Sequence, residues 1–181
     1  AERLAGDDTP ECRRIAFWAY QQAALSREAC RRLERYIEGE AIGPEVRLSE
    51  RERVSVALAL AVATDTVDPI EMVGRMLASA DEQARVRFLG SAVAVLETER
   101  EALFETLCAD PCQVRESWVV EAIGLLNHPL RARHARRFVR AGLDALTTVQ
   151  RRGDIFFPKR WCDALLHGHA GSDAHLEVRS F

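Results

Sequence analysis

Four side chains that could bind a metal lie within fourteen residues near the end of the sequence. Cys162, His167, His169 and His175 supply a thiol and three imidazoles, the ligand types that zinc prefers in a tetrahedral site. Their spacing matches no zinc pattern, and Gly168 indicates that a helix ends here. Imidazoles are also favourable at a helix C-terminus, where exposed carbonyl groups carry partial negative charge. We therefore predict helix-end imidazoles here rather than a metal site.

The cysteines indicate no redox centre. Three residues, one of them a proline, separate Cys108 from Cys112, whereas a redox pair favours two intervening residues at a helix N-terminus. The chain has five cysteines, at positions 12, 30, 108, 112 and 162, an odd number without recurring spacing. A chain of 181 residues does not need a disulfide framework. We predict reduced, mostly buried thiols.

Recognisable catalytic motifs are missing from the sequence. It contains no P-loop, no dinucleotide-binding glycine pattern, no nucleophile elbow and no His-Glu-x-x-His. The sequence therefore predicts no catalytic, metal-binding or cofactor-binding residue in this chain.

Positive charge is concentrated in residues 131–160. This segment has nine cationic residues against Asp144 and Asp154, a local net charge of +7. Because the whole chain has a net charge of −3, the other residues together carry −10. Such a surface could bind phosphates, the acidic rest of the chain, a neighbouring domain or a peptide. No stacking platform or groove-reading motif accompanies the charge, so we favour a domain- or peptide-facing surface and no nucleic acid. Its candidate residues are Arg133, Arg136, Arg137 and Arg140.

An apolar corner is predicted between two helices at residues 151–165. Gly153 is placed to end the first helix in a left-handed conformation, and Ile155 to Phe157 should then be extended, because a residue before proline avoids the helical region. Pro158 suits the first position of the next helix. Phe157, Trp161 and Leu165 are four residues apart and form one apolar stripe. We expect the linker itself to pack inward.

The remaining pattern is helical throughout, and no strand pattern occurs. Helix starts are predicted at Thr9, Ser26, Ser49, Asp68, Ser79, Thr98, Asp110 and Ser172, with Gly39 ending the second helix. The first helix carries Ile15, Trp18, Ala19 and Gln22 at helical spacing, and residues 54–63 are apolar all round, as in the middle of a stack. A longer helical region is expected after Asn127-His128-Pro129, and the residues that should face one way in it are Phe138, Ala141, Gly142, Ala145, Leu146 and Val149.

The spacing of the predicted starts favours stacked helix pairs. From Thr9 to Ser49, Ser79 and Asp110 the steps are 40, 30 and 31 residues. We predict an all-α fold, an irregular α-solenoid of antiparallel helix pairs of HEAT or armadillo type. A compact irregular bundle is the competing shape.

Length and composition favour one helical-repeat domain over residues 1–181. No apolar run approaches the roughly 18 residues of a membrane span, and no signal peptide is visible. We predict no membrane partner and favour the cytoplasm. Because the chain begins at Ala1 without a methionine, we interpret it as part of a longer protein.

Three stretches resemble one known family. They are Glu116-Ser117-Trp118-Val119-Val120-Glu121-Ala122, Leu126-Asn127-His128-Pro129-Leu130-Arg131 and Arg152-Gly153-Asp154-Ile155-Phe156-Phe157-Pro158-Lys159-Arg160-Trp161. Over residues 116–169 the chain resembles the C-terminal helical region of the M1 family of zinc aminopeptidases, especially the bacterial members. It departs from that pattern at Cys162, where leucine is common, and at Ala141-Gly142, where a proline is common.

The resemblance implies a HEAT-like, non-catalytic domain that walls the substrate chamber and docks on the catalytic domain of a longer enzyme. The zinc would be held in that missing domain, so no catalytic residue carries over to this chain. Peptide substrate and the catalytic domain are the implied partners. Two alternatives remain open: a stand-alone helical-repeat scaffold for another protein, and a nucleic-acid binder that uses residues 131–160.

Overall fold

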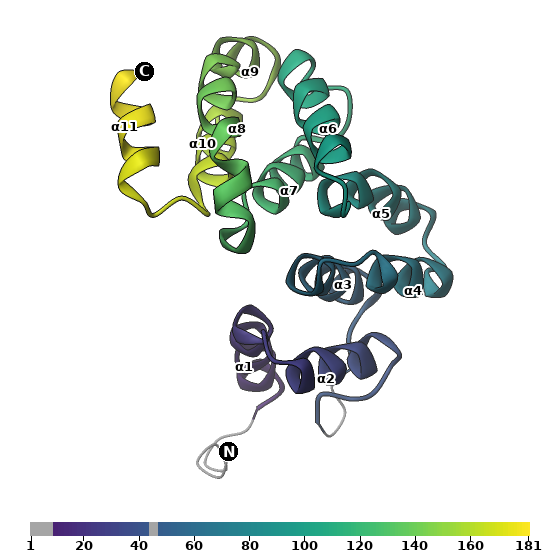
Figure 1. Ribbon diagram of the computed structural model, residues 1–181. Coiled ribbons are helices and arrows are strands. Elements are labelled where there is room, and N and C mark those ends of the chain that lie inside the picture. The colour runs from purple at the N-terminus through teal and green to yellow at the C-terminus, as the bar shows by residue number, and fades with distance from the viewer. Residues whose placement is uncertain (1–8, 44–46) are drawn as a thin grey trace. The chain divides into compact units, whose positions relative to one another are not determined.

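Eleven α-helices and one short 3-10 helix form the computed structural model of this chain over the residues that it describes, 9–43 and 47–181 (Figure 1). The described side chains exclude those of residues 172–174 and 177. No β-strand occurs in these ranges, so the predicted all-α fold is confirmed. None of the described helices is long and apolar enough to cross a membrane.

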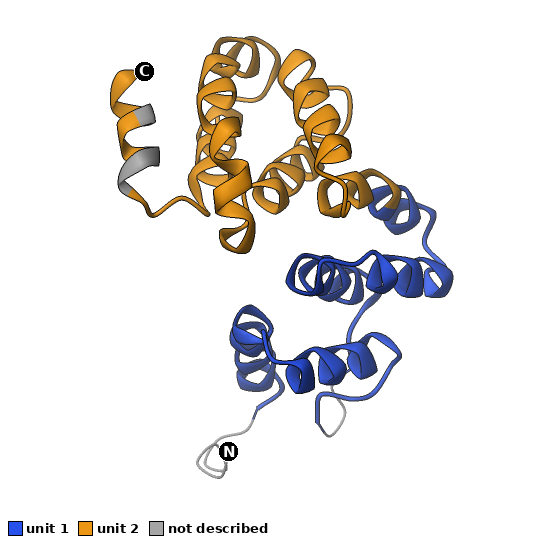
Figure 2. Ribbon diagram, viewed as in Figure 1, with its two compact units in different colours: residues 1–86 blue, residues 87–181 orange. Residues whose placement is uncertain are grey.

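The chain separates into two compact units, residues 1–86 and 87–181 (Figure 2). Unit 1 contains α1 (Pro10–Ala23), α2 (Arg27–Ile37), α3 (Glu50–Thr64), α4 (Asp68–Met76) and the first half of α5 (Ala80–Val93). Unit 2 contains the rest of α5, α6 (Glu97–Ala109), α7 (Glu116–Leu126), η1 (Pro129–Arg131), α8 (Ala132–Asp144), α9 (Leu146–Arg152), α10 (Phe157–Leu166) and α11 (Ser172–Ser180).

Helix α3 is the centre of unit 1. It contacts α1, α2 and α4, and most of its apolar positions are buried: Val54, Val56, Ala57, Leu58, Leu60, Ala61 and Val62. A helix surrounded in this way has apolar surface removed from water on every side. This burial stabilises the fold by about 25 cal/mol for each Å² of apolar surface. The predicted central position of this segment is therefore confirmed within its unit.

The starts of α1, α2 and α3 are those that the sequence predicts. The hydroxyls of Thr9 and Ser26 accept from the third residue beyond each of them, and Ser49 and Glu52 form a complete capping box. Gly39 adopts φ +108° just beyond α2, a left-handed conformation in which glycine has no Cβ penalty.

The residues of α1 noted for their helical spacing, Ile15, Trp18, Ala19 and Gln22, do not form its buried face. Ile15 is 70% exposed and Trp18 is exposed as well, while Phe17 and Gln21 are buried. The Phe17 ring packs edge-on against Tyr36 at 5.6 Å between centroids. Both sets of positions have helical spacing, so the spacing of α1 could not decide which one meets α2 and α3.

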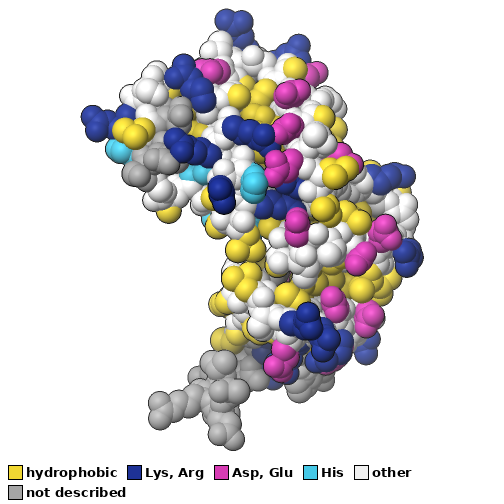
Figure 3. Space-filling model, viewed as in Figure 1, with side chains coloured by type: hydrophobic (Ala, Val, Ile, Leu, Met, Phe, Trp, Pro, Cys, Tyr) yellow, Lys and Arg dark blue, Asp and Glu magenta, His cyan; other side chains and the backbone are white. Residues whose placement is uncertain are grey.

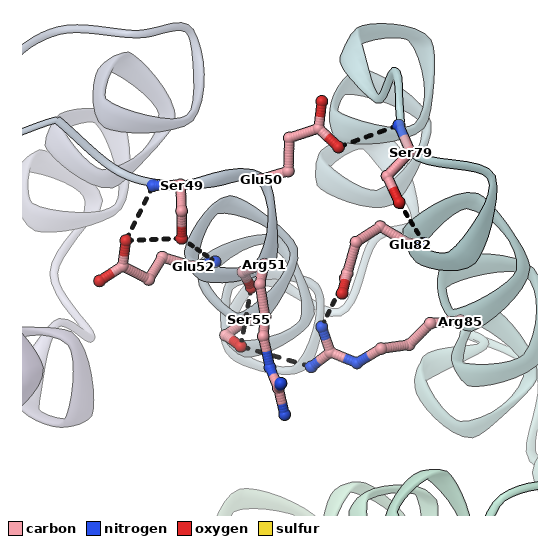
Figure 4. A network of polar contacts seen from close by, with 8 residues as sticks. All are labelled: Ser49, Glu50, Arg51, Glu52, Ser55, Ser79, Glu82 and Arg85. Atoms are coloured by element: carbon pink, nitrogen blue, oxygen red, sulfur yellow. Dashed lines mark hydrogen bonds and ion pairs between the residues drawn. The ribbon is translucent and has the colours of Figure 1, made fainter.

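A polar network joins α3 to the start of α5 within unit 1 (Figure 4). The Glu50 carboxylate accepts from the backbone N–H groups of Ala78 and Ser79 at 2.9 and 3.1 Å. Ser79 in turn caps α5 by accepting from the Glu82 N–H at 3.4 Å. Buried Arg85 donates to Glu82 at 2.8 Å. The cap of α5 therefore depends on a carboxylate from α3.

Unit 2 is built around α8 and α10. Helix α10 contacts α7, α8 and α9, and α8 also contacts α6 and α11. The Phe104 and Phe138 rings stack at 4.4 Å between α6 and α8. The longer helical region predicted after Pro129 is divided into α8 and α9 at Ala145.

The apolar stripe of the predicted corner is confirmed. Phe157, Trp161 and Leu165 are each completely buried. The Trp161 indole Nε1–H donates to the carbonyl of Gly142 at 2.9 Å. Two of these side chains thus reach α8: the indole through its hydrogen bond and Leu165 through close approach to Gly142.

Three details of that corner differ from the prediction. Gly153 is extended (φ −92°, ψ 176°) rather than left-handed, and it excludes a side chain because a Cβ there would lie 2.1 Å from Cδ1 of Phe157. Helix α10 begins at Phe157, so Pro158 is its second residue. The linker is a turn, not an extended inward-packing segment: Ile155 is 85% exposed and Phe156 is 64% exposed.

Hydrogen bonds explain the turn. The Asp154 carboxylate accepts from the Phe156 N–H at 2.7 Å, and the Asp154 carbonyl accepts from the Phe157 N–H at 3.1 Å. This side-chain turn competes with the extended conformation that proline favours before it. It places Ile155 and Phe156 at the turn tip, where they meet solvent.

Three predicted helix starts are also corrected. Helix α6 begins at Glu97 with no side-chain cap, so Thr98 is inside it. Asp110 starts a turn, and α7 begins six residues later at Glu116. The N-cap of α11 is Gly171 rather than Ser172. Asp110 instead accepts from the Cys112 N–H at 3.3 Å and from Arg152 at 2.6 Å, which holds it in the turn.

Two buried arginines cap the C-terminal end of α5. The Arg131 guanidinium donates to the carbonyls of Ala92 and Val93 at 3.3 and 3.2 Å, and Arg100 donates to those of Ala94 and Val95. The last carbonyls of a helix have no partner within it, so cations are favourable there.

Packing between neighbouring helices is consistent with a solenoid of helix pairs, which stays a prediction, as does the single domain.

Candidate binding surface on helix α8

Helix α8 has an inner and an outer face with the same spacing. Ala135, Phe138, Val139 and Gly142 are buried at positions i, i+3, i+4 and i+7. Arg133, Arg136, Arg137 and Arg140 occupy the same relative positions and are exposed. Residues with this spacing form one stripe along a helix, so the apolar packing of the inner stripe fixes the direction of the outer one.

The outer face borders a hollow of about 540 Å³ lined by Arg133, His134, Arg136, Arg137 and Arg140. All four arginines predicted for a binding surface therefore line the same hollow. Its lining in the described residues contains no carboxylate and, apart from the imidazole of His134, no aromatic ring.

Acidic residues of α6 lie beside this hollow. Glu97 is 2.8 Å from Nδ1 of His134 and 3.4 Å from a terminal nitrogen of Arg137, and Glu101 pairs with the other terminal nitrogen of Arg137. Basic and acidic side chains lie next to one another over unit 2 (Figure 3). The positive charge of α8 is thus partly neutralised by carboxylates of α6.

The two ends of the arginine stripe keep donors available. Arg140 uses Nε for both Asp144 oxygens, each at 3.2 Å, and its guanidinium lies 5.8 Å from the centre of the Phe181 ring. Arg133 makes no ion pair or hydrogen bond with the described residues. Each guanidinium has five N–H donors, so both ends can still bind a carboxylate.

Most other cations of residues 131–160 have structural partners. Arg131 caps α5, Arg152 pairs with Asp110, and Arg160 lies 2.7 Å from both Glu116 and Asp154. Lys159 pairs with Asp163 at 2.5 Å. The basic segment is therefore several separate sites, and its α8 part lines the hollow described above.

The histidines at the chain end do not converge with Cys162. His169 Nε2 lies 2.9 Å from the amide oxygen of Asn127, and His128 Nδ1 accepts from the Leu130 N–H at 3.2 Å. Burial lowers the pKa of the His169 imidazole. Burial, then nearby Arg131 and His167, lower the pKa of His128. No group of three potential metal ligands occurs among the described side chains.

The cysteines are free thiols. Burial, reinforced by Glu105, raises the pKa of Cys108 to about 11, and burial with Asp163 raises that of Cys162. A raised pKa keeps a thiol protonated and weakly nucleophilic. The predicted mostly buried thiols are found only in part, because Cys30 is buried, Cys108, Cys112 and Cys162 are partly buried, and Cys12 is exposed.

Sequence reasoning missed the acidic rim of the surface and His134. Glu97 and Glu101 are four residues apart on α6, which indicates a shared helix face. Nothing local shows that this face meets α8, so their pairing depends on tertiary packing. Comparisons of the chain with family models, curated proteins and solved structures gave no match.

Proposed function

We propose that this chain is the non-catalytic C-terminal helical domain of an M1-type zinc aminopeptidase, where it walls the substrate chamber and docks on the catalytic domain. The observation that carries the proposal is that the stretches resembling this family contact one another. Glu116, from the first stretch, accepts from the Asp154 N–H at 2.8 Å and from Arg160 at 2.7 Å, both in the third.

The second stretch joins the same packed piece. Asn127 is completely buried and donates to the Ile123 carbonyl at 3.0 Å. A Cβ on Gly168 would lie 1.8 Å from the Asn127 carbonyl, so the end of α10 approaches the end of α7 closely. The three stretches therefore lie in one packed piece over residues 116–169, as the proposal requires of a single domain.

Zinc chemistry does not fit the side chains that the structure describes. The sequence lacks His-Glu-x-x-His, and the described part of the structure offers no cluster of three ligands. The proposal therefore assigns zinc and catalysis to another domain of the parent enzyme. For this chain it leaves surface roles, with the α8 hollow as the candidate peptide- or domain-facing site.

A second candidate, a helical-repeat scaffold that binds another protein, is favoured by one observation. Ile155 and Phe156 are exposed on a turn fixed by Asp154, Glu116 and Arg160. A rigid apolar pair of this kind loses little conformational entropy on binding. Docking on a catalytic domain would use the same feature, so the exposed pair is compatible with both candidates.

The complete reading frame separates these candidates. The proposal expects His-Glu-x-x-His upstream, about one zinc per full-length protein by elemental analysis, and hydrolysis of aminoacyl reporter substrates. The 181-residue chain alone should have neither stoichiometric zinc nor hydrolysis. A reading frame without a metallopeptidase motif, or tightly bound zinc in this chain that disappears in the His167→Ala/His169→Ala variant, would contradict the proposal.

A further inference from the structure

We infer that the outer face of α8 binds an extended acidic polypeptide segment whose carboxylates are three residues apart. This inference goes beyond the proposed function and does not depend on it. Its basis is the hollow of about 540 Å³ whose lining, in the described part of the chain, consists of four arginines and His134. Arginine guanidinium groups match carboxylates in shape and bind them through paired hydrogen bonds.

The spacing of the available donors sets the spacing of the ligand. Arg133 and Arg140 are seven residues apart on one stripe, about 10 Å along a helix that rises 1.5 Å for each residue. A polypeptide in the polyproline II conformation has three residues per turn and rises about 3.1 Å for each residue. Its side chains at i and i+3 therefore point the same way, roughly 9 Å apart, and match the two arginines.

The acidic rim favours a peptide over a nucleic acid. Glu97 and Glu101 lie against the middle of the stripe, where they pair with His134 and Arg137. A peptide with separated carboxylates can engage Arg133 and Arg140 and leave this middle region neutral. A phosphate backbone carries charge continuously and would approach both glutamates. Base stacking also favours several aromatic rings, whereas the described lining of the hollow supplies only the imidazole of His134, which pairs with Glu97.

The partly neutralised surface predicts weak binding that falls with salt. Exposed carboxylate–arginine pairs contribute little individually, and salt at 0.15 M screens charges beyond about 8 Å. We therefore expect a weak complex, with a dissociation constant no tighter than on the order of 10⁻⁴ M. Such an interaction would be used together with other contacts to the same partner.

The test is a fluorescence anisotropy titration of the 181-residue chain with a labelled, N-acetylated and C-amidated peptide of four Glu-Pro-Pro repeats. Capped ends ensure that any binding comes from side-chain carboxylates. A Gln-Pro-Pro peptide of the same length controls for the backbone, and single- and double-stranded oligonucleotides test the alternative class. The variant Arg133→Gln/Arg140→Gln removes the two ends of the stripe.

A matched variant, Arg87→Gln/Arg151→Gln, changes the net charge equally. Both of its arginines are exposed in unit 2 and make no ion pair with described residues. We expect the acidic peptide to bind more tightly than the glutamine peptide. Arg133→Gln/Arg140→Gln should weaken it about three- to ten-fold and the matched variant less than two-fold, with unchanged circular dichroism.

Three outcomes would overturn the inference: no acidic-peptide binding up to millimolar protein, equal weakening by both variants, or tighter binding of an oligonucleotide that depends on Arg133 and Arg140. The last would assign the face to nucleic acid. None of these results bears on the reading frame, so failure of this inference remains distinguishable from failure of the proposed function.

Discussion

The two faces of α8 have the same spacing and opposite roles. The inner face holds Phe138 and Gly142 against the Phe104 ring, the Trp161 indole and Leu165. The outer face holds four arginines at a hollow, with ion pairs at its middle and available donors at its ends. Substitutions on the inner side should therefore change stability, whereas those on the outer side should change binding and leave stability nearly constant.

The largest effect is expected for Trp161→Ala, which should cost about 3–5 kcal/mol of unfolding free energy. Deleting a large buried aromatic leaves a cavity, and here it also removes the donor for the Gly142 carbonyl. Guanidinium-induced unfolding measures the change. Phe156→Ala, an exposed aromatic five residues earlier, should cost less than about 0.5 kcal/mol. Equal effects of the two substitutions would remove the distinction between buried corner and exposed turn.

A loss of roughly 2–3 kcal/mol is expected for Arg131→Met. The substitution keeps much of the buried side-chain volume but leaves the carbonyls of Ala92 and Val93 without their charged donor, and hydrogen bonds to charged groups contribute about 1.5–3 kcal/mol. Arg133→Met, two residues further on and exposed, is the matched control and should change stability by less than about 0.5 kcal/mol. Urea unfolding of both variants provides the comparison.

Acidification should destabilise the protein through His169. Burial lowers its folded-state pKa below the ordinary 6.5, so the unfolded chain binds more protons as pH falls through this range. Stability is then fully present above the unfolded-state pKa and declines below it. Unfolding at pH 8, 7, 6 and 5 should show a shallower decline for His169→Gln than for the wild type. Exposed His134→Gln is the control, and an unchanged slope in His169→Gln would contradict the assignment.

The smallest effect is expected for Arg137→Ala on the outer face. Its ion pairs with Glu97 and Glu101 are half exposed, and such pairs contribute roughly 0.2–1 kcal/mol. The difference from wild type should shrink further at 1 M salt, where the screening length is about 3 Å. Thermal unfolding at low and high salt measures it. A loss above about 2 kcal/mol that persists in salt would show that the outer face also maintains the fold.

Local chemistry explains where sequence-based prediction succeeded. The caps at Thr9, Ser26 and Ser49 were confirmed because each hydroxyl bonds a backbone N–H three residues away. The stripe of Phe157, Trp161 and Leu165 was confirmed because three large apolar residues four apart must share a face. Prediction was wrong at Thr98, which lies inside α6, and at Asp110, which starts a turn and pairs with Arg152.

The sequence by itself determined the helical class, the central position of α3, the buried stripe of α10 and the set of four arginines that share the outer face of α8. All of these follow from interactions within one helix or from its periodicity. Tertiary structure decided which side of α1 is buried, why Gly153 excludes a side chain, and that Arg131 is a buried cap while Arg133 is exposed. Those outcomes depend on groups 20 to 40 residues away, or on the approach of a ring such as Phe157, and no local pattern encodes such distances.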